Sequence, residues 1–260
     1  MHDLSDAVGF AEVALSIVLV GVGMAVSRLR KVGLEGDIGV ALLRSFVQLL
    51  AVGYVLEFVF EGHGGLTLIV LAAMVATAAF TSGRRARRVP SAALVAGAAV
   101  AVATAGTLGI LTALGIVPVQ ARAMVPLGSM VISNAMVTTS LVMTSLYDGL
   151  ADDRREVEAR LSLGETGREA ANPWVRRALR TGMLPIVDNT KVVGLVALPG
   201  AMTGMILAGA SPLAAIRLQL VVMYLILGGN AFAALVAGEL AVRRLFTPAH
   251  QLLRSVRRTA

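Results

Sequence analysis

The chain has no cysteine and few charged or aromatic residues. Of its 260 residues, 15% are charged and 4% are aromatic, whereas ordinary soluble domains contain roughly a quarter charged residues. The absence of cysteine excludes disulfides, thiolate metal sites and cysteine nucleophiles. The chain is 57% hydrophobic and its mean hydropathy is +0.80. This composition predicts an integral membrane protein.

Sequence motifs of enzymes are also missing. There is no G-x-x-x-x-G-K-[ST] phosphate loop, no G-x-S-x-G elbow and no H-E-x-x-H zinc motif. The three histidines, His2, His63 and His250, all fall in expected loops or termini. We therefore expect a chain that is not an enzyme and that binds no cofactor of its own.

The net charge of +7 does not point to nucleic acid, because the basic residues cluster at the ends of apolar runs without interleaved aromatics. Membrane helices need about 20 apolar residues to cross about 30 Å of hydrocarbon. Seven segments qualify, approximately 8–27, 38–60, 66–83, 91–115, 124–147, 190–209 and 212–242. The sixth contains Pro199 and Gly200, which we expect to bend or break it as a helix hinge.

Basic residues predict the orientation of these spans. Nineteen of the 23 lysines and arginines lie in segments 28–37, 84–90 and 148–186 and in the tail from residue 243. The positive-inside rule places all four in the cytoplasm if the N-terminus is outside. The start, Met1 to Phe10, lacks the basic region of a signal peptide, and we expect it to be retained. The predicted fold is an all-α, multi-pass protein of the cell inner (plasma) membrane, about seven spans in one permease domain, 1–260.

Segment 148–186, between spans five and six, holds seven acids and seven arginines. Ser162 and Glu165 have the spacing of a capping box, and Asn172-Pro173 is typical of a helix start. We therefore expect three short cytoplasmic helices. Two interpretations stay open: a solvated loop with surface charge pairs, or a docking element for a cytoplasmic partner.

Four blocks of the sequence resemble one known family: "RSFVQLLAVGYVLEFVF" (44–60), "VPLGSMVISNAMVTTSL" (125–141), "ARLSLGET" (159–166) and the long block 179–220. They are similar to the FetB family, the permease subunits of bacterial iron-export ABC transporters, with plant relatives linked to aluminium tolerance. The resemblance covers nearly the whole chain. It implies a permease homodimer in the lipid bilayer, with a separate FetA-like ATP-binding subunit that holds ATP and Mg.

The resemblance also implies a role for the charged segment. Glu158, Ala159 and Gly164 match the E-A-A-x-x-x-G coupling loop of ABC importers, but Arg160 replaces the second alanine and Leu184-Pro185 comes later than in that pattern. The residues expected to couple to the ATPase are Glu158, Leu161, Leu163 and Gly164.

Polar residues within the spans are candidates for the substrate pathway, since they are costly in lipid. Gln48 and Asn134 fall near the expected bilayer midplane, and Asp188 and Lys191 at the expected cytoplasmic end of span six. The alternative roles are interhelical hydrogen bonding for the amides and a surface ion pair for the charges. The full set of pathway candidates is Arg44, Gln48, Ser133, Asn134, Thr138, Asp188 and Lys191.

The expected midplane contains no carboxylate or imidazole, the ligands that iron favours, so the metal ligands stay unknown. We expect export of iron or a related metal species. One alternative is an ABC permease for a nucleotide sugar or other organic anion, for which Arg44 would be a contact. Another is an ATP-independent secondary transporter, against which the missing midplane carboxylate argues.

Overall fold

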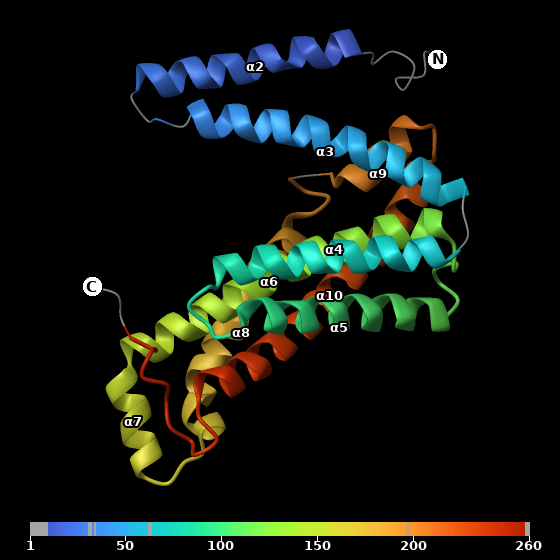
Figure 1. Ribbon diagram of the computed structural model, residues 1–260. Coiled ribbons are helices and arrows are strands. Elements are labelled where there is room, and N and C mark those ends of the chain that lie inside the picture. The colour runs from blue at the N-terminus through green and yellow to red at the C-terminus, as the bar shows by residue number, and fades with distance from the viewer. Residues whose placement is uncertain (1–9, 31–32, 34, 62–63, 197, 258–260) are drawn as a thin grey trace. The chain divides into compact units, whose positions relative to one another are not determined.

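The computed structural model describes residues 10–30, 33, 35–61, 64–196 and 198–257. Its regular elements are helices, and an antiparallel bridge joins Phe246 to Leu252. Figure 1 shows the helices in chain order. They are α2 (Phe10–Leu29), α3 (Glu35–Glu61), α4 (Gly64–Arg85), α5 (Ala92–Ala113), α6 (Ala121–Asp152), α7 (Arg154–Ser162), α8 (Gly167–Val192), α9 (Gly200–Leu207) and α10 (Pro212–Leu245).

Five helices of the described part are long and apolar enough to cross a membrane, namely α3, α4, α5, α6 and α10. They coincide with five of the seven expected spans. The apolar stretch of α2 is shorter, Ile17–Leu29, and residues 8 and 9 of the first expected span lie outside the described residues. The count of seven spans and their orientation stay predictions.

The sixth expected span, 190–209, is not one continuous helix. Helix α8 ends at Val192, and the next helix, α9, begins at Gly200 and has eight residues. Pro199 precedes α9 as its N-cap residue. The break therefore lies where the proline and glycine predict one, while their role as a hinge stays a prediction.

The chain divides into two compact units, each described here by itself. Unit 1 comprises residues 1–63 and 199–217, and unit 2 comprises residues 64–198 and 218–260. Unit 1 contains α2, α3 and α9, and most of the large side chains of α3 are exposed. Unit 2 contains the two buried core clusters and every candidate site residue except Arg44 and Gln48 of α3 and Pro199 and Gly200.

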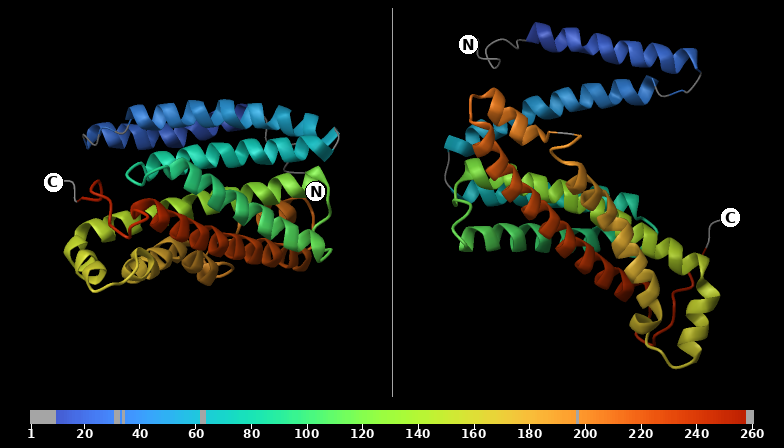
Figure 2. Two further views of the ribbon diagram at one scale, coloured as in Figure 1. Left: turned by 60° about the horizontal axis from the view of Figure 1, so that its bottom comes forward. Right: turned by 180° about the vertical axis from the view of Figure 1, so that it is seen from behind.

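Small residues let the helices of unit 2 approach closely. A Cβ on Gly83 of α4 would lie 2.7 Å from the backbone of Ala93 in α5, and one on Gly128 of α6 would lie 2.6 Å from Leu71 of α4. Alanines of α5 and α10 fill much of the core between them, including Ala96, Ala99 and Ala237. Figure 2 shows α4, α5, α6 and α10 from two further sides.

Helix α8 packs antiparallel against α6. Trp174 lies against Gly149, and Gly182, eight residues later in α8, lies against Val142 and the Thr138 carbonyl. Such contacts leave no room for a larger side chain at either glycine. Helix α8 therefore begins beside the C-terminal end of α6 and runs back along it toward its middle.

Candidate functional site

The charged segments of unit 2 gather at one end of its helices, which we call the charged end. It comprises residues 84–90, 147–180 and 239–257. Ion pairs join its parts: Arg88 to Asp148 at 3.0 Å and Arg168 to Glu239 at 2.8 Å. Three of the four segments expected in the cytoplasm thus lie together. The fourth, 28–37, belongs to unit 1 and is not placed relative to them.

The segment expected to be either a solvated loop or a docking element is a folded part of the charged end. Val157 of α7 is fully buried in the main core cluster, and Leu161 packs against that cluster. The indole Nε1 of Trp174 donates to Asp153 Oδ2 at 2.8 Å, and the Arg160 guanidinium lies 5.8 Å from the centre of the Trp174 rings. Helices α7 and α8 are therefore fixed to each other.

The C-terminal tail, residues 246–257, holds α7 in place. It contacts α7 and the start of α8 (Figure 1), with Leu252 and Val256 buried in the core. Arg154 of α7 donates from Nη1 to the carbonyls of Leu253 at 3.1 Å and Val256 at 2.6 Å. These are charge-assisted hydrogen bonds, stronger than neutral ones. The sequence does not predict this role for the tail, because the tail residues that contact α7 are about 100 residues away from it in the chain.

The helix start after α7 differs from the expected one. The capping box is formed by Thr166 and Glu169, not by Ser162 and Glu165: the Glu169 N–H donates to Thr166 Oγ1 at 3.3 Å, and the Thr166 N–H donates to Glu169 Oε2 at 2.9 Å. These two spacings are equally good in sequence. Ser162 is still part of α7, which is held in place by the buried Val157 and by the packing of Leu161. Helix α8 therefore starts only after the turn that follows Ser162.

The expected helix start at Asn172-Pro173 is also wrong. Pro173 lies inside α8, in its second turn. Beyond the first turn a proline removes the hydrogen bond to the carbonyl four residues earlier, and α8 continues through Pro173 without it. The segment therefore contains two helices rather than three.

Hydrogen bonding at this cap perturbs one acid. The Thr166 backbone N–H, and secondarily the Thr166 hydroxyl, donate to the Glu169 carboxylate and lower the pKa of Glu169 below its ordinary value. A smaller contribution comes from the nearby His250. The ionised carboxylate is thus the form that caps α8.

The turn between α7 and α8 presents the residues expected to couple to an ATPase. Leu163 is 86% exposed, and Gly164 has a φ of +96°, which favours glycine strongly over residues with a Cβ. Glu158 is exposed and pairs with Arg154 at 2.7 Å. Of the four coupling candidates, Leu163, Gly164 and Glu158 face outward, whereas Leu161 packs inward. An open hollow of about 450 Å³ adjoins the turn, lined in part by Arg160, Glu165 and Pro173.

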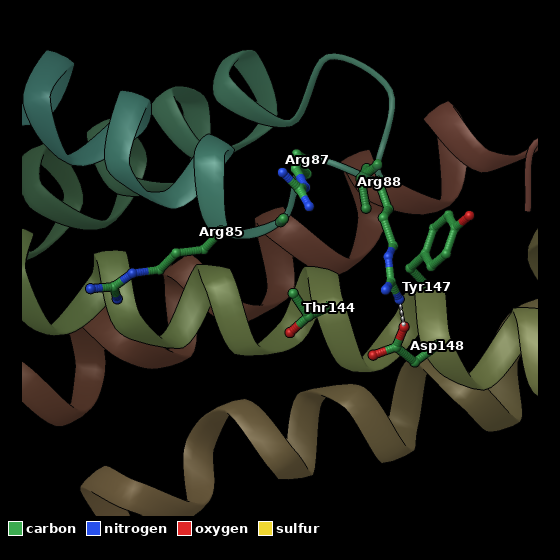
Figure 3. Close-up of a pocket in the computed structure, with 8 residues that line it drawn as sticks. Arg85, Arg87, Arg88, Thr144, Tyr147 and Asp148 are labelled. Atoms are coloured by element: carbon green, nitrogen blue, oxygen red, sulfur yellow. Dashed lines mark hydrogen bonds and ion pairs between the residues drawn. The ribbon is translucent and has the colours of Figure 1, made fainter. Parts of the chain in front are cut away.

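A second hollow lies at the turn between α4 and α5. Its volume is about 210 Å³, and it is lined by Arg85, Arg87, Arg88, Thr144, Tyr147 and Asp148 among others. Figure 3 shows Arg88 reaching toward Asp148 of α6. Thr144 lies on α6 as well, and the Arg85 side chain points away from both. This arrangement adds positive charge to the charged end, as the positive-inside rule leads one to expect for a cytoplasmic surface.

The packing of α8 against α6 sets the level of Asp188 and Lys191 along that helix. Gly182 lies beside Thr138 and Val142, and six further residues of helix advance about 9 Å. Asp188 is therefore level with residues near Ala135, the middle of α6. The sequence places it at a cytoplasmic boundary because the charged residues before it look like a loop. The packed residues Ala178, Gly182 and Ile186, each four apart, are the signal that could have shown a continuous helix.

Asp188 and Lys191 form an ion pair at the far end of α8. Lys191 Nζ lies 3.0 Å from Asp188 Oδ1, and the two side chains are 66% and 59% exposed respectively. Lys191 is nine residues, or two and a half turns, from Gly182, so it points to the side of α8 opposite α6. The pair therefore does not contact the α6 candidates, although it lies near their depth.

The α6 candidates bond mainly to their own helix. Ser133 Oγ and Asn134 Nδ2 both donate to the Met130 carbonyl, at 3.1 and 2.8 Å. Ser133 is exposed, Asn134 is half-buried and Thr138 is buried. Arg44 and Gln48 lie exposed on α3 in unit 1, which is not placed relative to α6 or α8. A pathway that joins all seven candidates stays a prediction.

Metal-binding geometry is absent from the described part of the chain. No three His, Asp or Glu side chains there are close enough to hold a metal ion together.

Comparison with known proteins identifies relatives along nearly the whole chain. Residues 10–246 match the family described as "Uncharacterised protein family (UPF0014)". The "UPF0014 membrane protein STAR2" of Oryza sativa subsp. japonica is 38% identical over 94% of this chain and 86% of its own length. The "Protein ALUMINUM SENSITIVE 3" of Arabidopsis thaliana is 38% identical over 94% and 90%. The "Probable iron export permease protein FetB" of Escherichia coli (strain K12) is 32% identical over 92% and 93%. No solved structure matches this chain.

Proposed function

Because the chain belongs to the UPF0014 family of multi-pass membrane proteins, we propose that it is the transmembrane subunit of an ABC transporter. In this proposal two copies form the permease, and a separate subunit binds ATP and Mg and hydrolyses the nucleotide. The cargo is iron or a related metal species, moved out of the cytoplasm. Similarity to a protein named as an iron export permease supports the cargo and the direction.

The observation that carries the proposal is the exposed turn at Leu163 and Gly164, mounted on a rigid support. Leu163 is 86% exposed and adjoins the open hollow of about 450 Å³ at the turn, so in this proposal the partner subunit covers its apolar side chain. This support is held rigid by the buried Val157, by the hydrogen bond between Trp174 and Asp153, and by the C-terminal tail. Force applied to the turn therefore moves helices rather than bending a loop.

Helix α8 gives that force a route into the membrane. It is continuous from Gly167 to Val192, about 39 Å at 1.5 Å per residue. One end adjoins the docking turn, and the other holds Asp188 and Lys191 at mid-depth. Beyond it, the break before Pro199 and Gly200 provides the hinge in this mechanism. A tilt of α8 driven by the ATPase would thus change access to the pathway residues.

Two substitutions in the turn test the docking role. We expect Leu163→Ser to weaken binding of the ATPase subunit about tenfold, because buried apolar anchors dominate interface energies. We expect Gly164→Asp to stop stimulation of ATP hydrolysis while the permease still inserts, because aspartate is strained at a φ of +96°. The matched control is Arg176→Ser, exposed on α8 away from the turn. Unchanged affinity and turnover in both turn variants would reject this docking surface.

A second candidate function is favoured by the depth of Asp188. A carboxylate at the middle of the membrane is a common feature of proton relays in secondary transporters, so on this depth the missing carboxylate would not argue against that class. The discriminating measurement is metal efflux from liposomes that contain the permease with its ATPase, with and without ATP. Transport that needs ATP supports the ABC permease, and equal transport without ATP supports the secondary transporter.

A further inference from the structure

We infer that Asp188 is the residue that contacts the cationic cargo, in a water-filled path at the middle of the membrane, and that Lys191 neutralises its carboxylate when no cargo is bound. The inference rests on the proposed transport function and adds to it a specific carboxylate and an internal competitor. Each step below concerns unit 2 alone and holds for either orientation of the chain in the membrane.

Depth is the first step. The contacts of Gly149 with Trp174 and of Gly182 with Thr138 and Val142 fix the register between α6 and α8. In this register Asp188 is level with residues near Ala135, and α6 runs from Ala121 to Asp152. Asp188 of α8 is therefore level with the middle of α6, which is long and apolar enough to cross the membrane.

Exposure is the second step. The Asp188 and Lys191 side chains are more than half exposed, although they lie at a depth where lipid tails would otherwise surround α8. Ionised side chains at this depth almost always face a protein interior or a water-filled cavity. The exposed face also carries Asn189, so it is polar over neighbouring positions. A water-filled path on this face satisfies all three side chains.

Ligand chemistry is the third step. Carboxylate oxygens suit hard divalent cations, and the described residues provide no cluster of three ligands that would hold such an ion tightly. The site therefore fits a weak contact with a hydrated cation, as transport requires. Lys191 Nζ already lies 3.0 Å from the carboxylate, so an arriving cation must displace the ammonium, and the returning ammonium favours release.

Thiol labelling tests the water-filled path without requiring transport. The sequence has no cysteine, so one introduced cysteine is the only thiol. We expect a membrane-impermeant charged thiol reagent to modify Asp188→Cys about tenfold faster than Val102→Cys, because only a hydrated thiol ionises readily. Val102 is an exposed apolar residue near the middle of α5 and serves as the matched control. Equal, slow labelling of both variants would overturn the inference.

Cation protection tests the role of Asp188. In the Asn189→Cys variant, which keeps Asp188 and Lys191, we expect Mn²⁺ to slow labelling, since Mn²⁺ prefers oxygen ligands to thiols. The protection should vanish when Asp188→Asn is added and should occur at lower Mn²⁺ concentration when Lys191→Met is added. Protection that is unchanged by Asp188→Asn would overturn the assignment.

The exchanged pair, Asp188→Lys with Lys191→Asp, separates a cargo contact from a structural ion pair. A structural pair would be restored by the exchange, whereas we expect cation efflux to stay impaired. Normal efflux in the exchanged pair or in Asp188→Asn would refute the inference and leave the proposed function intact. Rapid labelling and Mn²⁺ protection without ATP-driven efflux would instead refute the proposed function, while the cation site at Asp188 would still be supported.

Discussion

Two ion pairs of nearly the same geometry lie in different surroundings. Arg154 and Glu158 pair at 2.7 Å in the charged end, and Lys191 and Asp188 pair at 3.0 Å, level with the middle of α6. Exposed pairs one turn apart in water contribute only about 0.3–0.5 kcal/mol. A charged side chain at the centre of a bilayer costs about 2.5–3.5 kcal/mol on insertion scales. The first pair is therefore an ordinary surface feature, and the second needs a functional explanation.

The two halves of α8 are also held differently. In the first half, polar contacts of Thr166, Trp174 and the tail add to the buried packing of α8, whereas the second half is held by the packing of Gly182 and Ile186 alone. Polar contacts at a wet surface each contribute a modest amount, whereas a closely packed helix interface cannot absorb added volume. Substitutions in the two halves should thus differ in size and in their response to pH.

The largest effect is expected from Gly182→Leu. The new side chain would meet Val142 and the Thr138 carbonyl, so α8 must move away from α6, with a loss of about 3 kcal/mol, at the upper end for overpacking. The measurement is the thermal midpoint of the purified protein in detergent. Gly109→Leu is the control, because nothing lies within 4 Å of a Cβ at that position. Equal midpoints for the two variants would contradict the register on which the depth of Asp188 depends.

A smaller effect is expected from Arg154→Met in the charged end. It removes two charge-assisted hydrogen bonds to the tail carbonyls of Leu253 and Val256, with a loss of about 2 kcal/mol. We expect faster hydrogen exchange in residues 252–257 and in α7. Arg155→Met is the matched control, since the neighbouring Arg155 is exposed. If both variants exchange alike, the tail does not hold α7 through Arg154.

Much of the fold follows from the sequence, because long apolar runs have few alternatives to membrane helices. Five expected spans coincide with α3, α4, α5, α6 and α10, and the break near Pro199 follows from local backbone chemistry. The family likewise follows from the quoted blocks. These features depend on residues that are near one another in the chain.

Features that depend on distant residues could not be predicted from the sequence. The hydropathy of α8 resembles that of a loop, so the sequence alone places Asp188 at a membrane boundary. The contacts of Gly182 and Trp174 with α6 are what set its level along that helix. Likewise, Ser162–Glu165 and Thr166–Glu169 both fit a capping box, and the choice between them depends on which α7 residues are buried by the rest of the core.

A still smaller effect is expected from Thr166→Ala, which removes the cap of α8. Loss of a threonine N-cap costs about 1 kcal/mol, and we expect a matching decrease in thermal midpoint. Ser162→Ala is the control, because the Ser162 hydroxyl donates to its own helix at the Glu158 carbonyl, 2.9 Å away. A larger loss for Ser162→Ala than for Thr166→Ala would restore the capping box expected from sequence.

The smallest and most specific effect is a pH dependence at the start of α8. Hydrogen bonds from Thr166 lower the pKa of Glu169 in the folded protein, so the ionised carboxylate stabilises the folded state. This stabilisation is complete above the ordinary carboxyl pKa, about 4.3, and is lost as pH falls through the lowered value. We expect protection of the α8 N-terminal amides from hydrogen exchange to weaken below about pH 4.3, beyond the intrinsic pH dependence of exchange. Glu169→Gln can still cap but cannot titrate, so it should remove the additional change, whereas Glu158→Gln, in the wet i, i+4 pair, should leave it. An unchanged response in Glu169→Gln would mean that another group titrates, and that the first half of α8 is not held by the Glu169 carboxylate.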